Sequence, residues 1–280
     1  MSIYSGKKVA LLTQHGKEKV IAPILEPGLG CMIEHVTGFD TDQLGTFTRD
    51  TPRLGTQLDA ARRKARMGME LSGLSLGIAS EGSFVPDPFT GMFPWNIDLL
   101  LLIDDNLGIE VAGMAQGMGC SAHVHANNWD VAESFANREG FPQHNLVLRP
   151  QSQDDLRIQK GIADWPRLKS CFDECLAQSD KKQVFIEMDL RAFANPSRMQ
   201  RIKQATFDLL HRIQSSCPVC EIPGYWVTER QLGLPCSACG LPTSGYRNEI
   251  WSCLHCQHNS VRARTDYTAA DPMYCSDCNP

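Results

Sequence analysis

The cysteines near the end of the chain have the spacing of metal ligands. Eight of the twelve cysteines form four Cys-x-x-Cys pairs. Two thiolates three positions apart on a tight turn can face one tetrahedral ion, and a second pair completes the site, so we expect two structural zinc ions. The pairs are Cys217/Cys220, Cys236/Cys239, Cys253/Cys256 and Cys275/Cys278.

The grouping of the pairs depends on the segment between the second and the third. Residues 240–251 can form a hairpin, which predicts that Cys236, Cys239, Cys253 and Cys256 hold one ion. Cys217, Cys220, Cys275 and Cys278 would then hold the other. Sequential and crossed groupings fit the spacing as well, and each gives about two ions per chain.

Two polar segments follow apolar stretches in the first third of the chain, at residues 13–18 and 80–84. Because α/β proteins place ligands at the turns after strands, we expect the two segments to share a cleft. Lys17 could hold a phosphate, and Glu81 could hold a divalent cation or orient water. The alternative is a pair of tight turns with solvated side chains. The candidate residues are His15, Lys17, Ser80, Glu81 and Ser83.

Further charged residues could complete this site. Asp40 and Asp42 form a D-x-D pair whose carboxylates can converge on Mg²⁺ or Mn²⁺, although such pairs also occur in surface loops. Arg53 adds positive charge nearby, whereas the basic residues 62–64 are expected mainly on a solvated helix face.

A later cluster combines carboxylates and arginines after a buried strand. Residues 187–191 include Arg191, and residues 195–198 end in Arg198. Strand-end carboxylates with arginines often build ligand sites. A salt-bridge network that holds the last helix in place is an equal alternative.

These residues need a framework, and the hydrophobic patterns predict one. Strands are expected at 8–13, 31–36, 75–79, 97–103, 108–114, 121–125 and 183–188, and helices at 54–71, 151–178 and 197–213. A short helix should follow residue 18 and end near Pro27, and residues 80–84 should form a loop. The sequence therefore predicts an α/β domain over 1–215, a mixed sheet flanked by helices, and a zinc-ribbon-like module over 216–280.

Composition limits the classes of protein. The longest strongly apolar run, Leu99 to Ile103, is far shorter than the roughly 20 residues that span a membrane. The first residues lack the pattern of a signal peptide, so we expect a cytoplasmic protein. The net charge of −5 argues against broad binding to a nucleic-acid backbone.

The chain resembles an uncharacterised bacterial family, the domain of unknown function 6671. The resemblance rests on segments along nearly the whole chain, and it implies no activity. These segments are 15–18, 40–42, 45–48, 79–84, 189–191, Asn195, Pro196, Arg198 and the C-terminal cysteines.

Over about its first 120 residues, the chain also resembles the house-cleaning nucleoside-triphosphate pyrophosphatases of the inosine triphosphatase and Maf type. The matching segments are 13–17, 61–65 and 80–84, in that order. The resemblance implies that Lys17 holds triphosphate oxygens and that Glu81 and Asp42 hold Mg²⁺.

The leading hypothesis is thus a divalent-metal-dependent hydrolase of phosphoanhydrides or nucleotides with a structural zinc-ribbon appendage. The alternative is a non-catalytic ligand sensor whose zinc ribbon binds nucleic acid or a protein partner, with Trp226, Trp251, Arg247, Arg262 and Arg264 as contacts.

Overall fold

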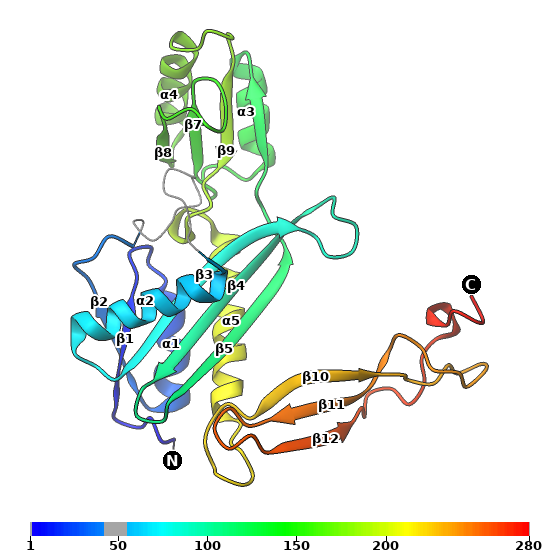
Figure 1. Cartoon of the computed structure of the whole chain (residues 1–280). Helices are drawn as coiled ribbons and strands as arrows, with labels where there is room; N and C mark the ends of the chain where they lie inside the picture. Colours follow the sequence, from blue (N-terminus) through cyan, green and yellow to red (C-terminus); the bar gives the residue numbers. More distant parts are fainter. Residues whose placement is uncertain (1, 42–54, 280) are drawn as a thin grey trace. The chain divides into compact units, whose positions relative to one another are not determined.

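The computed structural model describes residues 2–41 and 55–279, and Figure 1 shows the course of the chain. Its α-helices are α1 (Glu18–Leu29), α2 (Gln57–Ser72), α3 (Trp129–Arg138), α4 (Trp165–Ala177) and α5 (Pro196–Gln214). Its strands are β1 (Lys8–Leu12), β2 (Met32–Val36), β3 (Leu76–Pro86), β4 (Pro94–Asp104), β5 (Ile109–Met118), β6 (His123–Ala126), β7 (Leu146–Arg149), β8 (Gln159–Ile162), β9 (Val184–Met188), β10 (Trp226–Leu232), β11 (Tyr246–Ser252) and β12 (Asn259–Ala263). Short 3₁₀ helices η2 (Ala192–Ala194) and η3 (Pro272–Tyr274) complete the elements that we discuss.

The chain divides into two compact units. The N-terminal unit contains Met1–Asp104 and Ala112–Leu210, and the C-terminal unit contains Asp105–Val111 and His211–Pro280. None of the helices in the described part of the chain has the length and apolarity that crossing a bilayer demands.

A five-stranded sheet with the order β2-β1-β3-β4-β5 forms the centre of the N-terminal unit. β1 is parallel to both β2 and β3, and β3 is antiparallel to β4. The chain moves from β1 outward to β2 and then back past β1 to β3, so right-handed crossovers place α1 and α2 on opposite faces. Figure 1 shows this arrangement, with α5 on the same face as α1. The mixed α/β fold class predicted from the sequence is confirmed.

Local signals explain where α2 lies. Thr56 and Asp59 form a capping box at its start, and Gly73 ends it with a φ of 68°. The helix packs the small side chains of Ala61 and Ala65, together with Met69, against β3 and β4. Small side chains allow a close approach, which brings polar groups of α2 within reach of the sheet.

The expected loop at 80–84 is wrong, because β3 continues through these residues to Pro86. β4 pairs with β3 along its whole length, from Leu76 opposite Asp104 to Pro86 opposite Pro94. The polar side chains that suggested a loop are tolerated inside this strand because neighbouring elements supply partners for them.

A second sheet in the N-terminal unit has the order β6-β9-β7-β8, and all its pairings are antiparallel. α3 and α4 share one core with it, including Phe135, Phe172 and Ile186. The helix predicted over 151–178 is wrong in its first half, which contains β8, and α3 and β7 were not predicted. Here the core is shared among short elements, so each one leaves only a weak periodic pattern.

Candidate functional site

Lys17 joins the turn after β1 to strand β3. Its side chain is buried, and its Nζ donates to the main-chain oxygen of Ser80 at 2.7 Å. The pairing of β1 with β3 ends at Ile78. The Ser80 carbonyl that accepts from Lys17 therefore lies just beyond the end of this pairing. The Nζ atom also lies 3.5 Å from Ser80 Oγ. The structure thus brings the two polar segments of the sequence together.

Glu81 points toward α2, where Lys64 forms an ion pair with it. Both side chains are mostly buried, with 13% and 6% of their surfaces exposed. Lys64 is thus an exception to the expectation that the basic residues 62–64 lie mainly on a solvated helix face, whereas Arg63 is exposed and the Arg62 side chain is 38% exposed. Its position explains why: Lys64 follows Ala60 and Ala61 by four and three residues and so falls within the buried stripe of α2.

Gln57 anchors the same region from the first turn of α2. Its amide nitrogen donates to the main-chain oxygens of Glu81 at 2.7 Å and Ile97 at 3.0 Å. Its side-chain oxygen accepts a hydrogen bond from Ser83 Oγ at 3.0 Å. Ser83 is therefore engaged in positioning α2 against β3.

A buried ion pair joins α5 to β4. Arg198 Nη2 lies 2.7 Å from Asp98 Oδ1, and neither side chain is more than 2% exposed. Arg198 Nη1 also donates to the main-chain oxygen of Leu190, and its main-chain N–H donates to the Asn195 side chain. This pair passes over Gly82, where a Cβ atom would lie 2.6 Å from Asp98 Oδ1 and would also collide with the guanidinium. Only glycine leaves room for the pair.

Arg191 adds a positive charge closer to solvent. Its guanidinium binds the buried carboxylate of Asp189 through Nη2 at 2.5 Å and Nε at 3.0 Å. The Arg191 side chain is 19% exposed, and it also lies over the ring of Phe193 at 4.8 Å. Asp189 orients the guanidinium, so its outer edge is held in one position.

The positive charges are strong enough to change the ionisation of their neighbours. Burial, together with repulsion from Lys64 and Arg198, lowers the pKa of Lys17 to about 7 even though Glu81 and Asp98 oppose the change. Burial and the same kind of repulsion lower the pKa of His15 to about 4, so this imidazole is neutral at pH 7. A bound anion would therefore stabilise the charged form of Lys17, which burial and the neighbouring cations disfavour.

A hollow of about 470 Å³ lies beside this charged cluster. Its walls come from the first turn of α1, from η2 and from the first turns of α5. The residues that line it include His15, Lys19, Phe193, Met199, Gln200 and Lys203. His15 belongs to both features, since it lines the hollow and lies within the field of the cluster's cations.

Other charged residues of the N-terminal part of the chain are not part of this cluster as the structure describes it, apart from Asp98. Asp42 and Arg53 lie outside the described residues, so their assignments stay predictions. Asp59 is used in the cap of α2 and pairs with Arg62 at 3.0 Å. Sequence reasoning misses Asp98 as part of the site. The residue precedes an apolar run, and nothing in that local pattern indicates that its partner is an arginine 100 residues later.

The cysteines of the C-terminal unit gather into two groups of four. In each group, the four sulfur atoms lie within 4.8 Å of one another. The closest pairs are 3.6 to 3.9 Å apart, which matches the ~3.8 Å expected around a tetrahedral ion with metal–sulfur bonds of about 2.3 Å. The groups are Cys217, Cys220, Cys253 and Cys256, and Cys236, Cys239, Cys275 and Cys278.

This grouping is crossed, so the predicted pairing is wrong. Residues 246–252 form β11, the middle strand of an antiparallel sheet, instead of one arm of a hairpin between two ligand turns. β11 carries the chain from one end of the sheet to the other, which separates Cys239 from Cys253. Trp226 at the start of β10 pairs with Ser252 at the end of β11, so the cysteines before β10 meet those after β11.

Thiolate chemistry also suits these groups to a cation. The N–H groups of Cys239 and Ala238 lower the pKa of Cys236 to about 7, and the Ala238 nitrogen lies 3.4 Å from its Sγ. His258 stacks against Tyr225 and is not a member of either group, and neither is His255. The two groups can each hold one metal ion.

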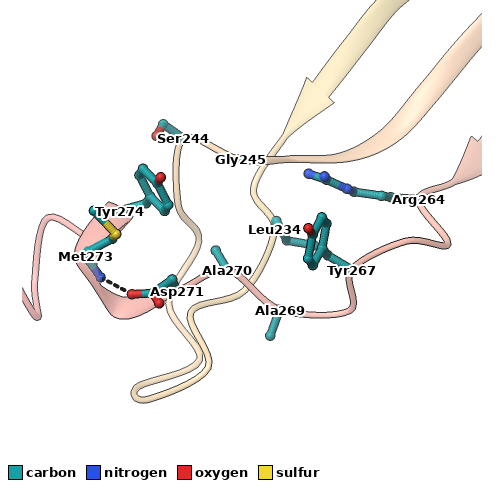
Figure 2. A pocket seen from close by; sticks show the side chains of 10 residues that line it. All are labelled: Leu234, Ser244, Gly245, Arg264, Tyr267, Ala269, Ala270, Asp271, Met273 and Tyr274. Carbon is teal, nitrogen blue, oxygen red and sulfur yellow. Dashed lines mark hydrogen bonds between the residues drawn. The ribbon is translucent and has the colours of Figure 1, made fainter.

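The C-terminal unit also carries arginines stacked on aromatic rings. Arg262 lies 3.9 Å above the Trp251 ring, and Arg264 lies 4.2 Å from the Tyr246 ring. A cavity of about 540 Å³ adjoins the second of these contacts. Figure 2 shows Arg264 and Tyr267 together on one side of the cavity and Tyr274 on the other.

Comparison with known proteins identifies a family and no activity. The family described as Domain of unknown function (DUF6671) matches residues 64–280. This stretch includes Lys64, Glu81, Arg198 and all the grouped cysteines, whereas Lys17 precedes it. The chain matches no curated protein.

Proposed function

The chain belongs to the DUF6671 family, and from its site we propose that it is a divalent-metal-dependent hydrolase of phosphoanhydride bonds in nucleotides, with two structural zinc ions in its C-terminal unit. The observation that carries this proposal is the group of Lys17, Lys64, Arg191 and Arg198, whose charges all act on His15 and of which Lys17, Lys64 and Arg198 contact β3 or its side chains. These four basic side chains accompany three carboxylates, and because burial and two of the cations lower the pKa of Lys17, a bound anion would favour its charged form.

Each side chain has a part in this proposal. Arg191 and Lys64 retain some exposure and would contact the phosphate oxygens first. Lys17 and Arg198 lie deeper and would stabilise the negative charge through their field. Because the main chain at Ser80 is held by Lys17, the position of Glu81 is fixed relative to these cations.

Glu81 would change partners when a substrate binds. In the structure its carboxylate is neutralised by Lys64. We infer that Lys64 moves to the phosphate and that Glu81 then becomes available to Mg²⁺ or Mn²⁺, which neutralises charge on the phosphate when bound. The attacking water would form a new P–O bond and pass its proton to the solvent. The bridging P–O bond would break, and its electron pair would leave on the departing phosphate.

The proposed substrate class follows from the order of three motifs along the chain. In this proposal the segments 13–17, 61–65 and 80–84 resemble, in that order, motifs of pyrophosphatases of the inosine triphosphatase and Maf type, although here residues 80–84 lie within β3 instead of a loop. This resemblance favours nucleoside triphosphates over other phosphoanhydrides, and it assigns Asp42 as a second carboxylate for the metal.

Release of phosphate and pyrophosphate from a panel of standard and altered nucleotides, with Mg²⁺ or Mn²⁺, tests the proposal. We expect release from the wild type and at least about a 100-fold loss in Glu81→Gln. Glu34→Gln is the matched control, because it makes the same chemical change on an exposed carboxylate of β2. Absence of release from folded wild type, or full activity in Glu81→Gln, would refute the hydrolase.

A second candidate function is binding of nucleic acid or a protein partner by the C-terminal unit. The stacking of Arg262 on Trp251 and of Arg264 on Tyr246 favours it, since aromatic rings with arginines can bind unpaired bases. Binding of single-stranded oligonucleotides that survives Glu81→Gln and is lost in Arg262→Ala and Arg264→Ala would support this function.

A further inference from the structure

We propose that the hollow between the starts of α1 and α5 binds the base of a nucleotide, and that Phe193 is the surface on which the base stacks. This inference rests on the proposed phosphate-binding role of the adjacent cluster. It assigns nucleotides as the substrate class of that site, because a base can stack on Phe193 and an inorganic phosphate chain cannot.

Phe193 presents an aromatic ring to solvent at the hollow. About half of its surface, 51%, is accessible to solvent, although its neighbours Ala192 and Ala194 are buried in η2. Arg191 lies 4.8 Å from the ring centre, and the His15 ring lies 5.6 Å away at an angle of 52°. These two contacts hold the ring in place, so a stacking surface exists before any ligand binds.

The composition of the hollow suits a flat heterocycle. Its volume of about 470 Å³ is within the range of small-ligand sites, roughly 300–1,000 Å³. Met199 supplies an apolar, adaptable surface, and Gln200 offers both a donor and an acceptor to the edge of a base. Lys19 and Lys203 at the rim favour a ligand with negative charge.

Two residues, His15 and Arg191, connect the hollow with the charged cluster. His15 lines the hollow and experiences the charges of Lys17, Lys64, Arg191 and Arg198. Arg191 contacts Phe193 from the side of the cluster. A nucleotide can therefore place its base on Phe193 and direct its phosphates toward Arg191. His15 is neutral at pH 7, so it can accept or donate a hydrogen bond without repelling a neutral base.

Calorimetric titration of the zinc-loaded full chain tests this assignment. The probes are ATP, GTP and inorganic tripolyphosphate without added Mg²⁺ or Mn²⁺, so that binding is measured apart from hydrolysis. We expect Phe193→Ala to weaken nucleotide binding by about 5- to 150-fold and to change tripolyphosphate binding by less than about twofold. Phe193→Trp should retain the preference for nucleotide, and Phe207→Ala is the matched control because Phe207 is a similarly exposed phenylalanine on α5 that does not line the hollow.

The outcomes separate this inference from the proposed hydrolase. If the wild type binds nucleotide no tighter than tripolyphosphate, or if Phe193→Ala weakens both equally or neither, the base site is refuted. Hydrolysis that depends on Glu81 would still support the proposed function in that case. If the preference for nucleotide depends on Phe193 but no hydrolysis occurs, the base site stands and the hydrolase is refuted.

Discussion

The buried ammonium of Lys17 should link the stability of the N-terminal unit to pH. Its pKa is lowered from 10.5 to about 7 in the folded protein. Between these values the unfolded chain binds a proton that the folded chain does not, so the free energy of unfolding should increase as pH rises. Below pH 7 both states carry the charge, and the folded protein bears the full cost of burying it.

The size of the effect follows from the two pKa values. Between pH 7 and pH 9, linkage predicts that the Lys17 contribution to the free energy of unfolding increases by about 2 kcal/mol. Substitution by methionine removes the charge and retains a similar side-chain length. The difference in stability between wild type and Lys17→Met should therefore change by this amount over the same range.

Urea unfolding at pH 6, 7, 8 and 9, followed by circular dichroism, measures this difference. Lys19→Met is the matched control, because Lys19 is an exposed lysine two residues away and its substitution should leave the pH dependence unchanged. Suppose instead that the stability difference between wild type and Lys17→Met varies by less than about 0.5 kcal/mol between pH 7 and pH 9. That result would refute the lowered pKa of Lys17.

Two further predictions concern the ion pair at β3 and the metal ions. Gly82→Ala should reduce stability by about 3–5 kcal/mol in thermal or urea unfolding, because its Cβ would separate the buried Arg198–Asp98 pair, and a loss below about 1 kcal/mol would contradict that packing. Metal analysis should find about two zinc ions per chain. The double variant Cys217→Ser/Cys253→Ser should lose only one ion, because both cysteines belong to the same group. Loss of both ions would contradict the crossed grouping.

Several elements could be predicted because their signals are local. The apolar run after Lys7, the helix-forming side chains of α2 and the apolar run from Leu99 to Ile103 predict β1, α2 and β4 close to their observed bounds. The Cys-x-x-Cys spacing likewise determines that the C-terminal unit can bind metal, because each ligand turn is a local structure. His15, Lys17 and Glu81 were identifiable as candidates because polar residues follow strand-like stretches.

Long-range partners could not be predicted from the same patterns. Ser80 to Ser83 resemble a loop in sequence, and they form a strand because β4 pairs with them and Gln57 and Lys17 bind their polar groups. Lys64 resembles a surface lysine until Glu81 is placed opposite it.

The sequence by itself determined that this chain contains an α/β unit, eight cysteines with the spacing of metal ligands and a polar turn that contains a lysine. These features depend on residue type and short spacing. Only the tertiary structure decided which cysteines meet, which carboxylate neutralises which cation, and that Phe193 lies beside the charged cluster. These contacts depend on the order of the strands in each sheet and on the end of the sheet at which each strand finishes. The residues of a single strand do not indicate its direction relative to its neighbours. The crossed cysteine groups illustrate this, since the direction of β11 alone places Cys253 with Cys217.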